Sequence, residues 1–586
     1  MSKKFLKTMA AVFALMMAFP GFAACGGGDE DDIQFDDEGN IIPSDETVII
    51  NYWGVADKYE EMAMEEVVAS FNEKYEGIIE VVYTPKSANG YNENFILNMM
   101  DGPDVAQVDE QYFKNYVDQG VLEDISSFYN KALTDWTETS GSKGLDADDM
   151  IEGVMDRYRY NPQTTTSNTD DPLYAVTKDL TPTGIFYNKK FFTQAGITVV
   201  EETEESIAAY NKSHPTSKKI IKAFYQKDGE YYFNKSIAMN WEECIELSNV
   251  LMSEGGADYG FFTEWWFNYA FSVGGDCIEY VETEDSNYNG GFWKFTLNDN
   301  SKNYIVKDDA SAITVNGNTY QPGEIVAYTD KAQLTATQKA SCNELPSQRE
   351  AFTEFVRLSQ PKNQKVDSGL GTNFYGADAN GDVYGYAVTP APDEATEGKA
   401  AYFTNGKVAM LATTAMYQRQ FAELMGADKF DVAPMLQYKE YSEDGTEVLV
   451  HGIEGAHSQS EGVAMNANSN NKNAAWVFME YVAGKEGQEV FASTGQSVPY
   501  YGSLAFDEEG AFLTNQYAAD NSIIFANATM WQTPGDWWYL KDNKWIVDWS
   551  GVLNTNVRNG DMTLTQFYTC NEFKNAQSLL NAYTKK

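Results

Sequence analysis

The sequence predicts an α/β protein of two large lobes, with β-rich insertions on this α/β core. The chain has 586 residues, and domains usually hold about 100–200 residues, so two or three domains or two large lobes are expected. Short apolar runs that suit buried strands alternate with segments of helical periodicity, as in βαβ units. Polar, turn-rich stretches interrupt this alternation and read as insertions.

The first elements alternate between strand and helix. Residues 48–54 (VIINYWG) form a nearly continuous apolar run ending at glycine, which is typical of a buried parallel strand. Strands are also predicted over 78–83 and 104–109, and a helix over 111–119 that stops at Gly120. A helix between the first two strands is predicted from apolar residues at helical spacing, namely Met64, Val67, Val68, Phe71 and Tyr75.

The same pattern resumes in the second part of the chain. Strands are predicted near 174–176 and 184–188, and a helix opens at Asn240, with Glu243 placed to complete a capping box. Residues 473–491 predict another helix. The insertions are expected at roughly 200–235, 279–345, 375–395 and 437–460, with hairpin signals at Asn316-Gly317 and Asn380-Gly381.

The composition excludes several kinds of partner. The chain has 42 basic and 87 acidic residues, a formal net charge of −45. Nucleic acids and anionic lipid surfaces require basic patches, so neither is expected as a partner. Aromatic residues reach 14%, with 37 Tyr, 33 Phe and 12 Trp. This high content suggests a surface or cleft lined by aromatic rings.

The N-terminus predicts export and anchoring. Lys3, Lys4 and Lys7 precede an apolar stretch over 9–19, which is too short to span a membrane but suits an export signal. Phe22-Ala23-Ala24-Cys25 resembles the lipobox of bacterial lipoproteins. It implies that residues 1–24 are a signal peptide, that Cys25 carries lipid, and that the acidic stretch 25–46 is a flexible tether. The protein would then sit on the extracellular or periplasmic face of the membrane; an ordinary cleaved signal is the alternative.

No enzyme or metal motif is present in the sequence. It lacks HExxH, the GxxxxGK[ST] loop and the GxSxG elbow, and it has three histidines. Residues 378–382 begin like a calcium loop, but Val383 stands where glycine belongs, so a turn is expected. No catalytic residue, cofactor or metal is therefore predicted. The other four cysteines, Cys244, Cys277, Cys342 and Cys570, lack CxxC spacing, and free thiols are favoured for most of them.

Seven pieces of the chain resemble one family in order. They are VIINYWG, FNEKYEGIIEVVY, GPDVAQVDEQYFKNYVDQGVLEDI, YAVTKDLTPTGIFYNKKFFTQAGI, NWEECIELSNVL, YFTNGKVAM and the stretch from Glu461 to Pro499. This order resembles the extracellular solute-binding protein family 1, which includes the maltodextrin-binding protein and other sugar-binding lipoproteins of ABC importers. The resemblance covers about 47–580, apart from the insertions.

The resemblance implies a two-lobed, periplasmic-binding-protein-like fold of type II, with crossing strands and a ligand cleft between the lobes. Crossings would fall near 173–178, 430–435 and 499–508. Lobe one would be 47–175 plus 436–503, and lobe two 176–435 plus 504–586. The implied function is capture of a carbohydrate, an oligosaccharide, by lobe closure and delivery to an ABC permease by a monomeric protein.

Aromatic side chains at the cleft are the first ligand candidates, because Trp and Tyr rings cover the apolar faces of sugars. Trp53 ends the first strand, with a core position as the alternative. At most one of the neighbours Trp265 and Trp266 is expected to face ligand, and core packing is the alternative for each. The loop-like stretch 531–538 contributes the strongest candidates, Trp531, Trp537 and Trp538, whereas Trp545 and Trp549 are expected in the core.

Polar candidates complete the predicted site. The family motif usually has a Trp where Met416 stands, so Tyr417 is the substitute and Arg419 could reach a hydroxyl. Asp109 ends the third strand, with a helix cap as the equal alternative. Lys178 and Asp179 lie at the first crossing, and Glu461 begins a late strand. The rival functions are a binding protein of the same fold for peptides or another polar solute, and a glycoside-cleaving lipoprotein.

Overall fold

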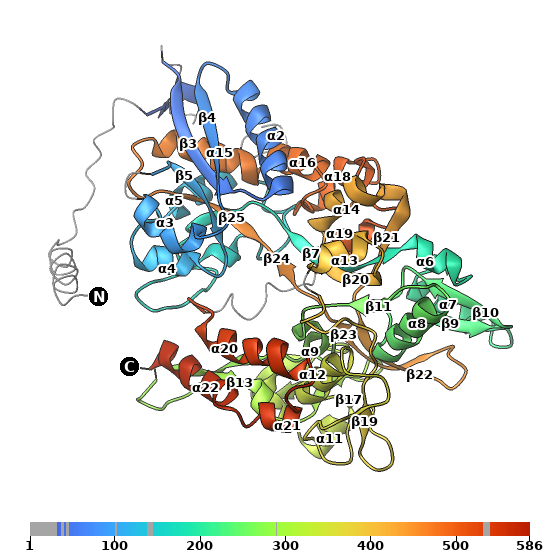
Figure 1. The fold of residues 1–586 in the computed structure, drawn as a ribbon. Coiled ribbons are helices and arrows are strands. Elements are labelled where there is room, and N and C mark those ends of the chain that lie inside the picture. Colours follow the sequence, from blue (N-terminus) through green and yellow to red (C-terminus); the bar gives the residue numbers. More distant parts are fainter. Residues whose placement is uncertain are drawn as a thin grey trace.

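A computed structural model describes residues 32–36, 40–42, 46–99, 102–136, 144–288, 290–395, 397–530 and 540–585. The predicted signal peptide, the lipidation site Cys25 and the ligand candidates Trp531, Trp537 and Trp538 lie outside the described residues. Two five-stranded sheets lie in different halves of the molecule (Figure 1).

The first sheet has the order β4-β3-β5-β25-β6. Its strands are β3 (Val48–Val55), β4 (Ile79–Lys86), β5 (Val105–Asp109), β6 (Ala175–Thr177) and β25 (Glu461–Met465). β3 pairs in parallel with β4 and β5, whereas β25 runs antiparallel between β5 and β6. The predicted strands at the start of the chain are therefore confirmed. The parallel strands end at one edge, and their ends carry Trp53 and Asp109.

Helices cover the first sheet. The predicted helix after the first strand is confirmed as α2 (Lys58–Lys74), and the others in this half are α3 (Tyr91–Met99), α4 (Phe113–Asp118), α5 (Ser126–Asp135), α15 (Lys472–Ala483) and α16 (Lys485–Ser493). The single helix predicted over 473–491 is wrong, because Gly484 adopts an extended conformation (ψ 164°) that separates α15 from α16.

The second sheet has the order β11-β20-β7-β21, and β24 also pairs with β7. Its strands are β7 (Thr181–Asn188), β11 (Tyr259–Phe262), β20 (Val408–Thr414), β21 (Phe430–Ala433) and β24 (Ser458–Gln459). All eight residues of β7 are buried. Its neighbouring helices include α6 (Lys189–Gln194), α8 (Trp241–Ser253), α13 (Lys399–Thr404), α14 (Tyr417–Met425) and α19 (Ile523–Thr529). The capping box of Asn240 and Glu243 at α8 is confirmed.

Small sheets and hairpins form the expected insertions. They contain β8 (Thr198–Val200), β9 (Phe224–Lys227), β10 (Glu230–Asn234), β12 (Ile278–Glu282), β13 (Gly291–Phe295), β14 (Asn303–Val306), β15 (Ile313–Val315), β16 (Asn318–Tyr320), β17 (Cys342–Leu345), β18 (Lys365–Val366), β19 (Val383–Tyr384), β22 (Gln437–Tyr441) and β23 (Val448–Glu454). The Asn316-Gly317 hairpin is confirmed between β15 and β16, with φ values of 51° and 95°. Positive φ at both turn residues is what this dipeptide favours.

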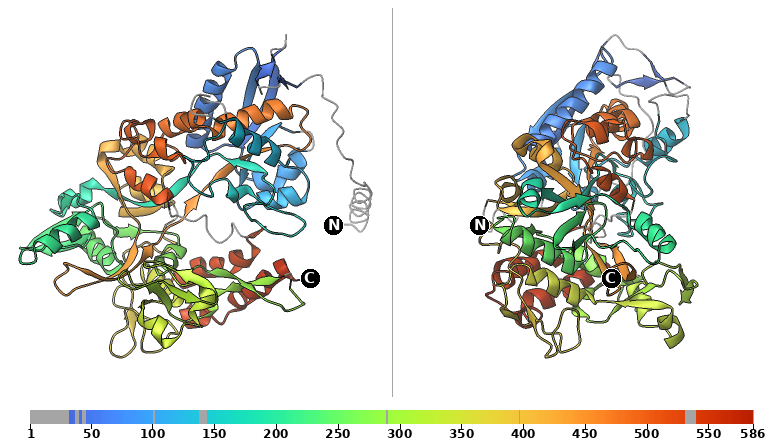
Figure 2. Two further views of the ribbon diagram at one scale, coloured as in Figure 1. Left: turned by 180° about the vertical axis from the view of Figure 1, so that it is seen from behind. Right: turned by 90° about the vertical axis from the view of Figure 1, so that its right-hand side faces the viewer.

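The remaining elements are short helices and the C-terminal helices. They are α7 (Glu204–Ser213), α9 (Phe267–Ser272), α10 (Tyr328–Lys331), α11 (Ala336–Ala340), α12 (Gln348–Arg357), α17 (Gly502–Ala505), α18 (Ala511–Thr514), α20 (Lys544–Val552), α21 (Leu564–Phe567) and α22 (Asn571–Thr584), with a small hairpin of β1 (Gln34–Phe35) and β2 (Ile41–Ile42). α20 and α22 lie in the half opposite β3 and β4 (Figure 1), which the views in Figure 2 also show. No helix in the described ranges has the length and apolarity that a membrane span requires.

Buried residues form separate cores in the two halves. One cluster surrounds the first sheet, and the others surround β7 and its neighbours. Trp545 and Trp549 are fully buried in the second half, as predicted. Cys244, Cys277 and Cys342 are buried and Cys570 is half-buried, and all four described cysteines have free thiols, which confirms the expectation for this part of the chain.

Within the described residues, the chain passes between the sheets at three places. The first lies between β6 and β7, the second at Ser460 between β24 and β25, and the third near Val498, which bridges to Leu180. Residues 430–433, where a crossing was expected, instead form β21 against β7. Because Leu436, Tyr438 and Ala456 belong to the core around β7, we propose that the hairpin β22–β23 is part of lobe two. The other lobe boundaries stay predictions.

Candidate functional site

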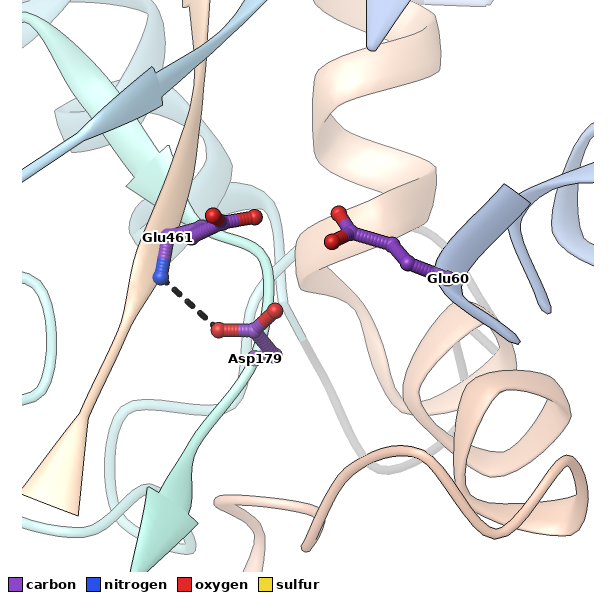
Figure 3. A group of neighbouring side chains, drawn as sticks. All are labelled: Glu60, Asp179 and Glu461. Carbon is purple, nitrogen blue, oxygen red and sulfur yellow. Dashed lines mark hydrogen bonds between the residues drawn. The ribbon is translucent and has the colours of Figure 1, made fainter. Parts of the chain in front are cut away.

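A buried ion cluster lies where the first two connections leave the first sheet. Lys178 follows β6 and its side chain is fully buried. Its ammonium Nζ lies 2.8 Å from Glu461 Oε2 and 3.2 Å from Asp179 Oδ2, and it also donates to Glu60 Oε1. Glu60 comes from the first turn of α2, so one lysine joins α2 to two connections between the halves. Figure 3 shows the three carboxylates pointing toward one another.

Backbone and amide groups hold this cluster in place. Asp179 Oδ1 accepts a hydrogen bond of 2.8 Å from the backbone N–H of Glu461, and Lys178 N–H donates to Glu461 O at the same distance. Gln107 of β5 donates to the Glu461 carboxylate, and Gln488 of α16 donates to Lys178 O. Residues from four separate stretches of sequence therefore fix the charged groups.

The charged groups in the cluster shift one another's pKa values. Burial, together with the neighbouring Glu461 carboxylate, raises the pKa of Glu60 well above its usual range. Burial opposes the charge of Lys178, but the surrounding carboxylates outweigh it and hold the pKa of Lys178 well above its usual value. Oxygen atoms of Glu60, Asp179 and Glu461 lie within 4.8 Å of one another, a spacing that could hold a metal ion. The Lys178 ammonium, however, already contacts all three carboxylates.

Trp53 lies beside a cavity at the end of β3. The ring is half-buried, and Lys86 Nζ lies 4.0 Å from its centroid. The cavity has a volume of about 350 Å³. Tyr91, which fixes one wall, donates a hydrogen bond of 2.9 Å to Gln107 O. The rest of the lining is mostly polar: Lys86, Ser87, Asn89, Gly90, Asn94, Phe95 and Asn98. An aromatic ring can cover a sugar face, and the neighbouring asparagine amides can bond to its hydroxyls.

Asp109 lies next to the ion cluster. It is half-buried and pairs with Glu461 in the register of β5 and β25. Its Oδ1 accepts a hydrogen bond of 2.7 Å from Gln111 N–H, so the side chain supports the turn that leads to α4. Burial raises its pKa to about 6. Asp109 thus serves the local turn, and a contact with ligand stays a prediction.

The neighbours Trp265 and Trp266 occupy different environments. Trp266 is 5% exposed and packs on Trp549 and Phe352, with ring centroids 5.3 and 5.6 Å apart. This placement favours the core alternative for Trp266. Trp265 is half-buried, with Lys399 Nζ 4.4 Å from its ring centroid and the edge of His457 against it. Trp265 therefore remains the candidate of this pair.

Tyr417 and Arg419 begin α14. Tyr417 is half-buried and stacks on Phe421, with Lys399 Nζ 5.4 Å from its ring centroid. Arg419 is 2% exposed, donates to Thr494 O at 3.3 Å and lies 3.7 Å from Glu66 Oε1 of α2. Its guanidinium therefore links α14 to α2, which favours a structural role over a bond to ligand.

Contacts at α4 join the two halves away from the ion cluster. Asn115 Nδ2 donates to Lys541 O at 2.7 Å, and Lys541 Nζ lies 3.6 Å from Asp118 Oδ2. Asn543 Nδ2 also donates to Gln111 Oε1 at 3.3 Å. No local sequence pattern predicts these contacts, because they join residues more than 400 positions apart.

The structure brings together only part of the predicted site. Lys178, Asp179 and Glu461 meet in one cluster, with Asp109 beside them, whereas Trp265 and Tyr417 lie near Lys399 in the second half. Sequence reasoning missed Glu60 and Gln107. For Glu60 a signal existed, because this carboxylate lies on the apolar face of α2 that also carries Ala63, Met64 and Val67.

Comparisons with known proteins agree with this architecture. Two family models described as bacterial extracellular solute-binding protein match residues 53–319 and 372–511. No curated protein matches the chain. Solved structures share the fold. An ABC substrate-binding protein from Listeria monocytogenes in complex with cycloalternan has 16% identity and a TM-score of 0.54, covering 92% of this chain and 99% of that one.

Two further solved structures have similar scores. The GacH receptor of Streptomyces glaucescens, solved unliganded and in complex with acarbose, has 14% identity and a TM-score of 0.53, covering 91% of this chain and 98% of that one. The sugar-binding protein MalE from Xanthomonas citri has 14% identity and a TM-score of 0.52, covering 91% and 97%. The chain belongs to the bacterial extracellular solute-binding proteins and has their two-lobed fold.

Proposed function

We propose that the protein captures a carbohydrate, an oligosaccharide, between its lobes and delivers it unchanged to the permease of an ABC importer. The observation that carries this proposal is the Trp53 cavity, where an aromatic ring, a tyrosine and three asparagines line about 350 Å³ at the end of a parallel strand. Ligands of open α/β sheets bind at such strand ends. The ligands named for two relatives of this fold, cycloalternan and acarbose, support a carbohydrate.

Lobe closure is the proposed mode of capture. Ligand contacts divided between two halves form together only when the halves approach, so ligand shifts the equilibrium toward the closed form. The bonds of Asn115 and Asp118 to Lys541 join the halves, and we assign them to the closed form. Trp265, half-buried in the second half, is the proposed ring on the facing side.

We also propose how the protein is attached to the cell and in what state it acts. Lipid on Cys25 would anchor the protein to the membrane, on the extracellular or periplasmic face, and the acidic stretch before residue 47 would act as a tether. A monomer without enzymatic activity is expected. The family consists of solute-binding proteins, which supports binding without turnover.

A thermal-shift screen over mono- and oligosaccharides tests the proposal, because a ligand that binds the folded state raises stability by mass action. At a concentration 100 times its Kd, a ligand adds about 2.7 kcal/mol. We expect at least one oligosaccharide to raise the Tm of the wild type and to be recovered intact after incubation. Shortened products would support a glycoside-cleaving enzyme instead.

Two variants make the screen specific. At this concentration, about 100 times the wild-type Kd, Trp53→Ala should lose about half of the stabilisation given by the best oligosaccharide, because a tenfold weaker Kd leaves about 1.4 of about 2.7 kcal/mol. Tyr384→Ala is the matched control, because Tyr384 is 39% exposed on β19, outside the cavities described above. A panel of short peptides tests the rival function, a binding protein of the same fold for peptides. Shifts with peptides and none with carbohydrates would contradict the proposal.

A further inference from the structure

A small cavity lies at the point where all three connections between the halves meet. It has a volume of about 60 Å³. Asp179 belongs to the first connection, Glu461 to the second and Gln496 to the third, and all three line it. Glu60 of α2 and Met416, directly before α14, also line it. Any rotation of one half against the other therefore changes the surroundings of Glu60.

The charges around this cavity do not balance. Three carboxylates contact a single ammonium, so full ionisation would leave excess negative charge in a poorly hydrated place, which is costly. Carboxylate oxygens of Glu60 and Glu461 lie within 4.8 Å of each other. Burial and the neighbouring Glu461 charge raise the pKa of Glu60, whereas for Glu461 burial is outweighed by the Lys178 ammonium, which lowers its pKa. Two carboxyl groups in this arrangement share one proton.

The cavity also has room and an acceptor for a protonated carboxyl. Gln496 is 4% exposed and lines the cavity, and its Oε1 has no hydrogen-bond partner in the part of the chain that the structure describes. A volume of about 60 Å³ is enough for a water molecule, which needs roughly 10–15 Å³ by this kind of measure. A carboxyl O–H can therefore be satisfied there directly or through water.

We propose that Glu60 and Glu461 share a proton in the closed form and release it when the lobes open, so that lobe closure takes up a proton. The inference rests on the proposed function only in requiring that the lobes open and close. Opening would separate α14 from α2, hydrate Glu60 and let it ionise. Acidification then favours the closed form, because the closed form binds more protons.

Other titratable groups face the pair from the surrounding elements. Lys178 and Asp179 come from the first connection, Asp109 from β5, and the hydroxyls of Tyr52 and Tyr83 from β3 and β4. Burial raises the pKa of both tyrosines far above neutral pH, so they stay neutral. Burial raises the pKa of Asp179 and raises that of Asp109 to about 6, so either acid could mimic the effect. Asp109→Asn and Asp179→Asn separate their titration from that of the pair.

Small-angle X-ray scattering between pH 5 and 8 tests the inference. The sample is the chain without the predicted signal peptide, residues 1–24, and without ligand. One shared proton changes the ratio of closed to open form by up to about tenfold per pH unit. We expect the radius of gyration of the wild type to decrease as the pH falls. Asp109→Asn and Asp179→Asn should keep this dependence, and so should Glu65→Gln, which changes an exposed acid on the same helix.

Glu60→Gln should remove the dependence of the radius of gyration on pH. This variant should stay compact, because the amide mimics a protonated carboxyl. Glu461→Gln should also remove the dependence, since it breaks the same pair. A wild type whose radius is independent of pH would overturn the inference, and so would a Glu60→Gln chain, folded by circular dichroism, that responds as the wild type does. The experiment uses no sugar, so its outcome is separate from that of the carbohydrate screen.

Discussion

Removal of the Lys178 ammonium should destabilise the fold more than any loss of a surface charge. Lys178 is fully buried, and its partners Glu60 and Asp179 have side chains only 9% and 10% exposed. Lys178→Met keeps the length of the side chain and removes the charge. Three acids then lie together without a counter-ion, at the pivot between the lobes.

The expected magnitude follows from this burial. Breaking a buried ion pair by removing one partner costs about 3–5 kcal/mol, because the remaining charge stays buried and uncompensated. We expect Lys178→Met to lower the free energy of unfolding by about 4 kcal/mol at pH 7. The value is within this range because a shared proton already neutralises part of the negative charge of Glu60. The cost should shrink below about pH 5, where protonation removes the charge of the remaining acids.

Urea unfolding followed by tryptophan fluorescence measures this difference in the free energy of unfolding. Lys189→Met is the matched control: Lys189 pairs with Asp520 at the surface, where the side chains are 30% and 70% exposed. Such a pair contributes at most about 1 kcal/mol. If Lys178→Met lowered the free energy of unfolding no more than this control at pH 7, or by the same amount at pH 4 and pH 7, Lys178 would not be neutralising buried carboxylates.

Three further predictions concern the cleft and the core. Trp53→Ala should weaken the best oligosaccharide about tenfold, or about 1.4 kcal/mol, in calorimetry, and an unchanged Kd would remove Trp53 from the site. The double variant Asn115→Ala/Lys541→Ala should raise the Kd about tenfold without lowering urea stability, since it removes bonds that we assign to the closed form; equal affinity would contradict that assignment. Burial lowers the pKa of His457 to about 3, so the unfolded state binds more protons below pH 6.5, and stability should fall by up to about 1.4 kcal/mol per pH unit on acidification. His457→Gln should flatten this slope in urea titrations, and an unchanged slope would refute the assignment.

Local periodicity was enough to predict most elements of the first sheet. The apolar run of β3 and the helical spacing of α2 are properties of short windows, so they can be read without knowledge of the fold. The break between α15 and α16 could not be read in this way. The apolar pattern continues through Gly484, and only the turn at this residue separates the two helices.

The candidate site was predicted less well, because it depends on contacts between distant residues. Lys178 and Glu461 were chosen separately, yet they meet across 283 positions of sequence. Trp265 and Trp266 are identical in type and adjacent, and only tertiary packing places one in the core and leaves the other half-buried. Arg419 has a side chain that could bind a hydroxyl, but α2 supplies Glu66 as its partner.

The proposed function requires that a carbohydrate binds between the two lobes and leaves unchanged. Isothermal titration of the mature wild-type chain with the oligosaccharide that gives the largest thermal shift, followed by mass analysis of the recovered sugar, tests it most directly. We expect saturable binding of one sugar per chain and recovery at the original mass. Absence of binding by every oligosaccharide in the panel, or recovery of shortened chains, would contradict it.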